Sequence, residues 1–480
     1  MNIFDYLIID IGSTYTKQRL FKDYDLIASV QSPTTVNHVL YGINDGQSEI
    51  REKLGIDQIS AHHVLSSSSA AGGLRMVAIG FMMRVTAKAA KEVAMNSGSK
   101  ILEILSNENP SDYKIQVLRE INPDIILLAG GTDGGDEESI LNNASLIVES
   151  NVKATVVLAG NLYAQRKVAN ILRDGGVAYI RVPNIMPTIH ELRVKEAREE
   201  IHKEFIKQII KAQGLNAIQQ VITNDIIIPT PGAVLMAAEL LGKGTYRIRG
   251  LGSLIVVDLG GATTDVHSVV PEYEELDAEE RGLVVTNEKQ VSYRTVEGNI
   301  GMRVSAMGVL DAVDPRLILE RRGLNTYDVL ERFMAYCSML EEQHEHLAQN
   351  AEEEIFDELI AQTAIEIALK RHAGRIATEA DAIRGYLPGM PMGRDLRMVK
   401  TIIGVGGVFA HNKIEKSKQI IQRALKDAGA FLLPKNPQII IDQSYLLFAA
   451  GCINEVDADY AMEIMKRQFI DSDKTNKQEL

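Results

Sequence analysis

The sequence predicts an α/β protein built from more than one domain, and three observations carry that prediction. The chain has 480 residues, which is more than a single hydrophobic core usually serves. Apolar strands alternate with helical segments across residues 111–182, a pattern typical of a parallel sheet with right-handed crossovers. Residues 10–14 and 258–264 repeat one pattern, in which an apolar strand precedes an aspartate, a glycine and hydroxyl-bearing residues.

Composition and charge narrow the class of protein. Apolar residues make up 45% and charged residues 24% of the chain, as in ordinary globular proteins. The net charge of −13 leaves no basic stripe for a phosphodiester backbone, so we expect no nucleic-acid partner. No stretch approaches the roughly 18 apolar residues of a membrane span, and the acidic start does not fit a signal peptide. Cys337 and Cys452 predict no disulfide framework, so we expect a reducing, cytoplasmic compartment.

The first complete element is a predicted hairpin over residues 4–21, in which an apolar strand leads into a compact turn and an alternating strand follows. Groups in and beside the turn suit a triphosphate. A glycine lets the backbone approach a phosphate group, and hydroxyls reach phosphate oxygens. A lysine supplies positive charge, and a carboxylate holds the hydration shell of a magnesium ion. The residues concerned are Asp10, Gly12, Ser13, Thr14 and Lys17. Asp-x-Gly is also an ordinary tight turn, and the segment alone does not separate the two interpretations.

The rest of the first half is less specific. Residues 33–46 predict a loop with short strands, and residues 49–55 predict a short helix. The serine-rich run 66–73 is either a phosphate loop or a turn in which small residues permit close packing. The Gly-rich turn 130–135 either binds a second phosphate or simply needs glycine for positive φ. Two aspartates in and beside that turn disfavour an anion.

The second half carries two further turns of interest. An apolar strand ends at Asp258, and the turn after it offers Gly260, Gly261, Thr263 and Thr264. A third turn follows another apolar strand and offers Gly404, Gly406 and Gly407, which can lie against a purine and ribose where side chains would collide. Two facing hairpins of this kind can hold one polyphosphate, with Asp10 and Asp258 sharing a magnesium ion through water.

In order and in motif, the chain resembles the actin, Hsp70 and sugar-kinase ATPase superfamily. Residues 10–17 (DIGSTYTK) and 258–265 (DLGGATTD) look like its two phosphate motifs, and residues 404–411 (GVGGVFAH) look like its adenosine motif. Residues 230–241 and 445–454 lie where Hsp70 proteins carry their two connecting helices. The resemblance implies two lobes of ribonuclease H-like fold with a nucleotide in the cleft between them.

Four further segments narrow the resemblance to the MutL/GlmL family: residues 66–76, residues 129–136, the α/β insertion and residues 295–302 (TVEGNIGM). Members of this family are encoded beside coenzyme B12-dependent carbon-skeleton mutases, notably glutamate (methylaspartate) mutase. The resemblance implies a reactivating chaperone, in which ATP-driven movement releases damaged cobalamin from the mutase subunits. It implies ATP or ADP and Mg²⁺ as cofactors, a slow ATPase activity and no membrane. It leaves open a homodimer, and also whether the turn 130–135 binds part of a cobalamin.

Domain organisation and residue roles follow from the same resemblance. The first ATPase lobe would span residues 1–59, an inserted α/β module residues 60–225, and the second lobe with both connecting helices residues 226–480. Asp10 and Asp258 would organise magnesium and the attacking water, and Lys17 would offset phosphate charge. Glu297 is either a water-orienting carboxylate or a surface glutamate before a turn, and Asp265 either caps its hairpin or assists the preceding aspartate.

Other functions stay open at this point. A small-molecule kinase on the same scaffold would need a base beside its acceptor hydroxyl, and no sugar-kinase signature surrounds such a residue. A redox activator of the 2-hydroxyacyl-CoA dehydratase type would hold an iron–sulfur cluster with two nearby cysteines, whereas Cys337 and Cys452 lie in unrelated contexts. A nucleotide-gated binding protein without turnover remains if the inserted module is the working part.

Overall fold

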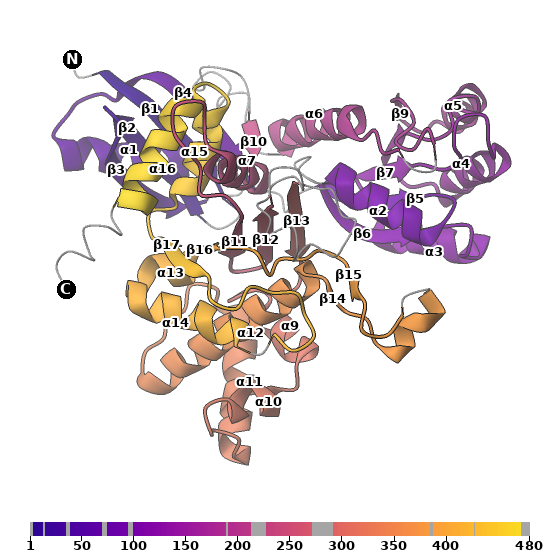
Figure 1. The fold of residues 1–480 in the computed structure, drawn as a ribbon. Helices are drawn as coiled ribbons and strands as arrows, with labels where there is room; N and C mark the ends of the chain where they lie inside the picture. The colour runs from indigo at the N-terminus through magenta and orange to yellow at the C-terminus, as the bar shows by residue number, and fades with distance from the viewer. Residues whose placement is uncertain are drawn as a thin grey trace. The chain divides into compact units, whose positions relative to one another are not determined.

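A computed structural model describes most of the chain and divides it into two compact units, Met1–Ala233 and Val234–Leu480 (Figure 1). The described residues are 3–12, 15–34, 39–69, 74–94, 99–188, 191–212, 227–270, 291–384, 387–426 and 428–471. Strands and helices both contribute to each unit, which confirms the α/β class. No helix in these ranges combines the length and the apolar character that crossing a bilayer requires.

The first unit opens with a five-stranded sheet in the order β10-β4-β1-β2-β3. The strands are β1 (Ile3–Ile11), β2 (Tyr15–Lys22), β3 (Asp25–Pro33), β4 (Ser60–Ser68) and β10 (Ile227–Pro229). β1, β2 and β3 are antiparallel neighbours, whereas β4 runs parallel to both β1 and β10. The central strand β1 is buried on both faces from residue 7 onward, which explains its almost unbroken apolar sequence.

Helix α1 (Val39–Leu54) corrects the loop predicted over residues 33–46, because only its last turns had been predicted as helix. The helix contains Gly42 and Gly46, which have low helix propensity. A Cβ on Gly42 would lie 2.8 Å from the Pro33 carbonyl oxygen, and one on Gly46 would lie 2.4 Å from a side-chain amide nitrogen of β2. The glycines therefore let the helix lie close against the sheet, and this packing outweighs their low helix propensity.

The middle of the first unit folds around a parallel sheet in the order β6-β5-β7-β8-β9. Its strands are β5 (Leu74–Ile79), β6 (Ser99–Leu105), β7 (Ile125–Leu128), β8 (Thr155–Leu158) and β9 (Tyr179–Arg181). Helices α2 (Met83–Ala94) and α6 (Lys195–Ala212) cover one face, and α3 (Ser111–Ile121), α4 (Glu138–Ser150) and α5 (Gln165–Asp174) cover the other. Alternate residues of β5 enter opposite cores, with Met76 and Ala78 under α2 and Val77 and Ile79 under α3 and α4.

The chain leaves the first sheet after β4 and returns to it at β10, so the parallel sheet is an insertion between these two strands. The strands and helices predicted between residues 111 and 182 are all present. Helix α6 begins at Lys195, after an isolated β-bridge between Thr188 and Glu191. We call the insertion, from β5 to α6, the inserted module.

The second unit repeats the strand order of the first sheet, here as β13-β12-β11-β16-β17. The strands are β11 (Leu254–Leu259), β12 (Thr264–Val269), β13 (Ser292–Glu297), β16 (Thr401–Val405) and β17 (Gln438–Asp442). Again three antiparallel strands are followed by two that run parallel to the first of them. This equivalence confirms the prediction of two ribonuclease H-like folds.

Helices account for most of the remaining second unit. They are α7 (Thr230–Lys243), which begins in the first unit, α9 (Ala306–Ala312), α10 (Pro315–Glu320), α11 (Tyr327–Glu342), α12 (Ala351–His372), α13 (Gly407–His411), α14 (Ile414–Leu425), α15 (Leu446–Asn454) and α16 (Ala458–Lys466). Thr326 is the N-cap of α11. Asn350 caps α12, and its side chain accepts the N–H groups of Glu352 and Glu353.

Candidate functional site

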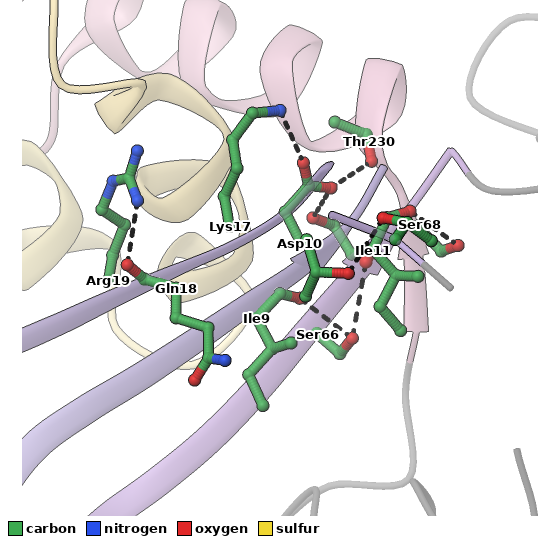
Figure 2. Close-up of polar contacts among 12 residues, drawn as sticks. Ile9, Asp10, Ile11, Lys17, Gln18, Arg19, Ser66, Ser68 and Thr230 are labelled. Atoms are coloured by element: carbon green, nitrogen blue, oxygen red, sulfur yellow. Dashed lines mark hydrogen bonds and ion pairs between the residues drawn. The ribbon is translucent and has the colours of Figure 1, made fainter. Parts of the chain in front are cut away.

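The register of the first hairpin brings two predicted site residues together. Asp10 on β1 lies directly opposite Lys17 on β2, and opposed residues of an antiparallel pair point to the same face. The ammonium nitrogen of Lys17 lies 3.3 Å from Asp10 Oδ2 (Figure 2). The carboxylate is 1% exposed and the lysine side chain 19% exposed, so the pair is shielded from water on the carboxylate side.

Two hydroxyls complete the surroundings of Asp10, and neither belonged to the predicted site. Ser67 lies beside Asp10 on the parallel strand β4 and donates to Oδ1 over 2.8 Å. Thr230, the first residue of α7, donates to the same oxygen over 2.5 Å (Figure 2). Two hydroxyl donors and an ammonium hold the carboxylate in a fixed orientation.

Gly12 closes the turn of this hairpin. Its N–H donates to the Tyr15 carbonyl oxygen over 3.1 Å, and a Cβ on Gly12 would lie 2.4 Å from that oxygen. Any side chain at this position would therefore open the turn. Ser13 and Thr14, which are predicted to bond phosphate oxygens, lie outside the described residues.

Gly260 closes the second hairpin in the same way. Its N–H donates to the Thr263 carbonyl oxygen over 2.9 Å, and a Cβ there would lie 3.1 Å from that oxygen. Asp258 is half-buried, precedes Gly260 at the spacing at which Asp10 precedes Gly12, and faces Asp265 across β11 and β12. The two predicted phosphate hairpins therefore share one backbone design.

The carboxylate opposite Asp258 has a cationic partner from the neighbouring strand. Arg294 on β13 donates to Asp265 Oδ1 through Nε over 2.8 Å and through Nη2 over 2.7 Å. Thr263 donates its hydroxyl to Asp265 Oδ2 over 3.4 Å. These contacts favour the interpretation in which Asp265 holds the second hairpin in shape.

The segment after β13 supports the second turn from behind. The N–H groups of Met302 and Arg303 donate to the carbonyl oxygens of Gly260 and Gly261 over 3.0 and 2.8 Å. A Cβ on Gly301 would lie 2.5 Å from the Gly261 carbonyl oxygen, so this approach requires glycine. The end of the segment TVEGNIGM thus gives backbone support to the turn.

Two residues of the predicted site form bonds within the fold. The Thr264 hydroxyl donates to the Ile300 carbonyl oxygen over 2.9 Å, and the side chain is fully buried. Glu297, opposite Thr264 in the register of β12 and β13, accepts from Arg371 Nη1 over 2.5 Å. This ion pair engages one carboxylate oxygen, and the water-orienting role of Glu297 stays a prediction.

The third glycine turn joins β16 to α13. Gly406 has φ of +125°, and a Cβ on it would lie 2.2 Å from the Leu259 carbonyl oxygen, so only glycine fits. A Cβ on Gly404 would meet the Ile421 side chain at 2.8 Å. Gly407 has more room. Because β11 and β16 are parallel neighbours, this turn and the Asp258 turn lie at the same edge of the sheet.

Asp442 is a residue at this edge that the sequence did not single out. It ends β17, which runs parallel to β16, and its side chain is fully buried. Its two carboxylate oxygens accept the N–H groups of Leu446 and Leu447, each over 2.9 Å. Asp442 thereby fixes the N-terminus of α15 beside the third glycine turn.

A buried polar network lies behind the second hairpin. His372 bonds to Thr295 Oγ1 through Nδ1 over 2.8 Å and to Ser268 Oγ through Nε2 over 2.7 Å. Arg394 donates to the same serine oxygen over 2.7 Å. Burial, reinforced by the charge of Arg394, holds the pKa of His372 well below its ordinary value, so the imidazole is neutral near pH 7.

Magnesium is the cation that the predicted chemistry implies. The ranges that the structure describes contain no group of three or more His, Cys, Asp or Glu side chains placed to hold a metal. Both Asp10 oxygens already accept side-chain bonds, so a water-bridged ion fits this carboxylate better than direct coordination. Magnesium commonly keeps several waters and binds through one or two carboxylates and substrate phosphates. The donors present therefore fit a hydrated ion held largely by a nucleotide.

Several solved structures align with most of the chain at low identity. Nucleotide-free acetone carboxylase aligns over 94% of this chain and 70% of its own, with 12% identity and a TM-score of 0.42. (R)-2-hydroxyglutaryl-CoA dehydratase component A of Acidaminococcus fermentans aligns over 96% of this chain and 99% of its own, with 10% identity and a TM-score of 0.30. Xylulose kinase of Lactobacillus acidophilus aligns over 96% of this chain and 92% of its own, with 12% identity and a TM-score of 0.31.

The similarity in sequence is much closer for one family. A family model described as MutL protein matches residues 6–469. Protein MutL of Clostridium tetanomorphum is 37% identical over 472 residues, which cover 97% of this chain and 99% of that protein. The match extends over both hairpins, the inserted module and the third glycine turn, and the chain therefore belongs to the MutL protein family.

Proposed function

We propose that this protein is a cytoplasmic, ATP-dependent reactivating chaperone for a coenzyme B12-dependent mutase of the glutamate (methylaspartate) type. In this proposal, binding and slow hydrolysis of ATP drive the release of damaged cobalamin from the mutase. The observation that carries the nucleotide part is the pair of matching hairpins, each with an aspartate ahead of a glycine that closes the turn. The mutase part rests on family membership and on the resemblance that the motifs indicate.

The first hairpin supplies most of the described groups for the hydrolytic step. Lys17 would turn its ammonium from Asp10 to the phosphoryl oxygens and offset their negative charge. Asp10, oriented by Ser67 and Thr230, would accept a hydrogen bond from the attacking water. The water oxygen bonds to the terminal phosphorus, the bond to the ADP oxygen breaks, and the water proton passes to phosphate or solvent. Magnesium, when bound, neutralises phosphate charge and aligns the phosphate chain.

The second unit supports the remaining contacts of the proposal. Gly260 and Gly261 would present their backbone to phosphate, while Gly404, Gly406 and Gly407 would admit the adenosine portion. Asp258 would bind the hydrated cation and orient water. Thr263 would reach phosphate with its hydroxyl, which lies beside Asp265. Phosphoryl transfer depends mainly on such positioning and electrostatics, and it needs no covalent intermediate on the protein.

Both cysteines weigh against a redox activator. Cys337 and Cys452 are buried and unbonded to each other, and burial raises the pKa of the Cys337 thiol. A cluster ligand must be a thiolate that a second subunit can reach, so neither position suits an interface iron–sulfur centre.

The decisive experiment uses glutamate mutase inactivated by bound hydroxo- or cyanocobalamin. The protein, ATP and Mg²⁺ are added, and free cobalamin is measured by its absorbance after ultrafiltration. Release with ATP, and not with a non-hydrolysable analogue, is the expected result. Rapid phosphorylation of a small metabolite in the absence of the mutase would contradict the proposal and favour a kinase.

A further inference from the structure

Among its described residues, the inserted module exposes large apolar side chains at one edge. In its described residues they are Phe81, Met82, Tyr113, Leu162 and Tyr163, which are 43%, 51%, 44%, 52% and 68% exposed. Each follows the carboxyl end of a strand or lies in the first helical turn after it. The described loops at the opposite edge contribute none. A concentration of exposed apolar side chains on one side of a module is a recognised mark of an interaction surface.

Four of these side chains flank the Gly-rich turn that follows β7. A Cβ on Gly130 would lie 3.4 Å from the Phe81 backbone nitrogen, and one on Gly134 would lie 3.8 Å from the Tyr163 ring. The turn therefore lies between the pair Phe81–Met82 and the pair Leu162–Tyr163. We call these four residues and the turn, residues 130–136, the edge patch.

The edge patch is held in one shape by hydrogen bonds. Asp133 Oδ1 accepts the Leu162 N–H over 2.8 Å and the Asn184 amide over 2.9 Å. Asn161 accepts the Gly134 N–H over 3.2 Å and donates to the Asp136 carbonyl oxygen over 3.1 Å. A surface that is already ordered loses little conformational entropy when a partner binds.

The loops that flank Phe81 and Met82 are acidic. In the strand order β6-β5-β7, the loop after β5 lies between the loops after β6 and β7. Segments 106–116 and 129–141 carry the acidic residues Glu108, Asp112, Asp133, Asp136, Glu137 and Glu138. Their one basic residue, Lys114, is buried and bonded to Asn143. Lys167 of α5 pairs with Glu137. Arg84 in the first turn of α2 and Arg166 in the first turn of α5 offset part of this charge, and an excess of acidic residues remains in the two loops around the apolar centre.

The position in the sheet is also the one that α/β proteins use for binding. The chain runs from β5 outward to β6, then crosses back to β7 on the other side of β5. At such a switch point the loops after the two central strands diverge, and partners bind at the carboxyl ends of the strands. Phe81 and Gly130 belong to the two diverging loops.

Charge selects among the classes of occupant. Nucleic acid and the anionic face of a membrane would both be repelled by the acidic loops. A second copy of this chain, joined through the same edge on a two-fold axis, would bring like charges together. A protein that presents apolar side chains among lysines and arginines complements the edge patch in both respects.

We propose that the edge patch is the docking surface for such a basic protein partner, and that this partner is the mutase. The inference rests on the proposed function for the identity of the partner, and on the module alone for the location of the surface. Phe81 and Tyr163 would be the apolar anchors, and the acidic loops would accelerate the encounter.

The test measures binding of glutamate mutase to the full chain by surface-immobilised kinetics at two ionic strengths. The apolar variant combines Phe81→Ser with Tyr163→Ser, and its matched control combines Leu317→Ser with Tyr327→Ser, which are also exposed but lie in the second unit. The charge variant combines Asp112→Lys with Glu138→Lys. We expect the apolar variant to weaken affinity at least about tenfold, and the control to bind like the wild type. The charge variant should slow association at least about fivefold and flatten its salt dependence.

Basal ATPase activity without the mutase should stay unchanged in all three variants. If the wild type and both edge variants bind equally, the docking surface is wrong while the proposed function stands. If the wild type neither binds the mutase nor releases cobalamin, the proposed function is wrong and the identity of the partner falls with it. A wild-type dimer that the apolar variant dissociates would assign the edge patch to a second copy and overturn the inference.

Discussion

The Asp10 and Asp258 hairpins close with the same backbone turn. The residue that faces the aspartate on the neighbouring strand is positively charged in the first hairpin and negatively charged in the second. The residue facing Asp10 is Lys17, which bonds to it directly. The residue facing Asp258 is Asp265, whose charge is compensated from the next strand by Arg294. The comparison teaches that a short sequence pattern determines the turn, whereas one cross-strand position determines the electrostatics. Each prediction below alters one side of that comparison.

Removal of either aspartate should have the largest effect. Asp10→Ala and Asp258→Ala are each expected to lower ATP turnover at least about 100-fold, because each removes an oriented anionic acceptor from the predicted site. Phosphate release measures turnover, and circular dichroism checks that the fold persists. Wild-type turnover in both variants would eliminate the site assignment.

Removal of the Arg294–Asp265 ion pair should have the second-largest effect. Arg294→Met leaves a nearly buried Asp265 without its cation, so we expect the second unit to lose about 3 kcal/mol of unfolding free energy. Adding Asp265→Asn should restore most of that loss, because no uncompensated charge then remains. Urea unfolding of the single and double variants measures both values. Equal stability of the single variant and the wild type would show that the pair adds nothing.

Substitution of the glycine that closes each turn should destabilise the two hairpins by different amounts. Gly12→Ala places a Cβ 2.4 Å from a backbone oxygen, whereas Gly260→Ala places it 3.1 Å away, where a small shift suffices. We expect about 3 kcal/mol of local destabilisation for Gly12→Ala and about 1 kcal/mol for Gly260→Ala. Hydrogen exchange in peptides that span each turn gives the comparison. The reverse order would mean that the first turn is the more adaptable one.

Acid should affect the second unit by a smaller and graded amount. Burial lowers the pKa of His267 and of His372 well below the ordinary value of 6.5, so the unfolded chain binds more protons below about pH 6.5. The unfolding free energy that these neutral histidines contribute is present above that pH. It is lost as the pH falls toward 5, by up to about 1.4 kcal/mol per histidine per pH unit. Unfolding measured from pH 7.5 to 5 tests the slope. His372→Gln should reduce it, and an unchanged slope would contradict the assignment.

The sequence predicted most elements, but not those whose residue types are more common in loops, such as the serine-rich end of β4 and the glycine-containing helix α1. Serine residues of β4 read as a loop, yet Ser66 and Ser68 donate to the carbonyl oxygens of Ile9 and Ile11 over 3.0 and 3.2 Å. These bonds satisfy buried hydroxyls inside a strand, and hydropathy does not detect them. Helix α1 was missed for a related reason, because glycines that serve close packing look like loop residues.

The candidate site was predictable where it is local and not where it depends on distant pairing. Asp10, Gly12 and Lys17 lie in one hairpin, and their spacing fixed their register. Ser67 and Thr230 reach the same carboxylate only because β4 and α7 bring remote segments beside β1. Asp442 was missed because a carboxylate that caps a helix after a strand has no distinguishing local pattern.

The Asp10–Thr230 hydrogen bond ties the site to the first residue of helix α7. The helix starts at Thr230 and continues without a break past residue 233, where the first compact unit ends and the second begins. A ligand that binds the Asp10 carboxylate would compete with the Thr230 hydroxyl, which bonds the first residue of this helix to Asp10. Loss of this hydrogen bond would therefore weaken the first turn of a helix that contributes residues to both units.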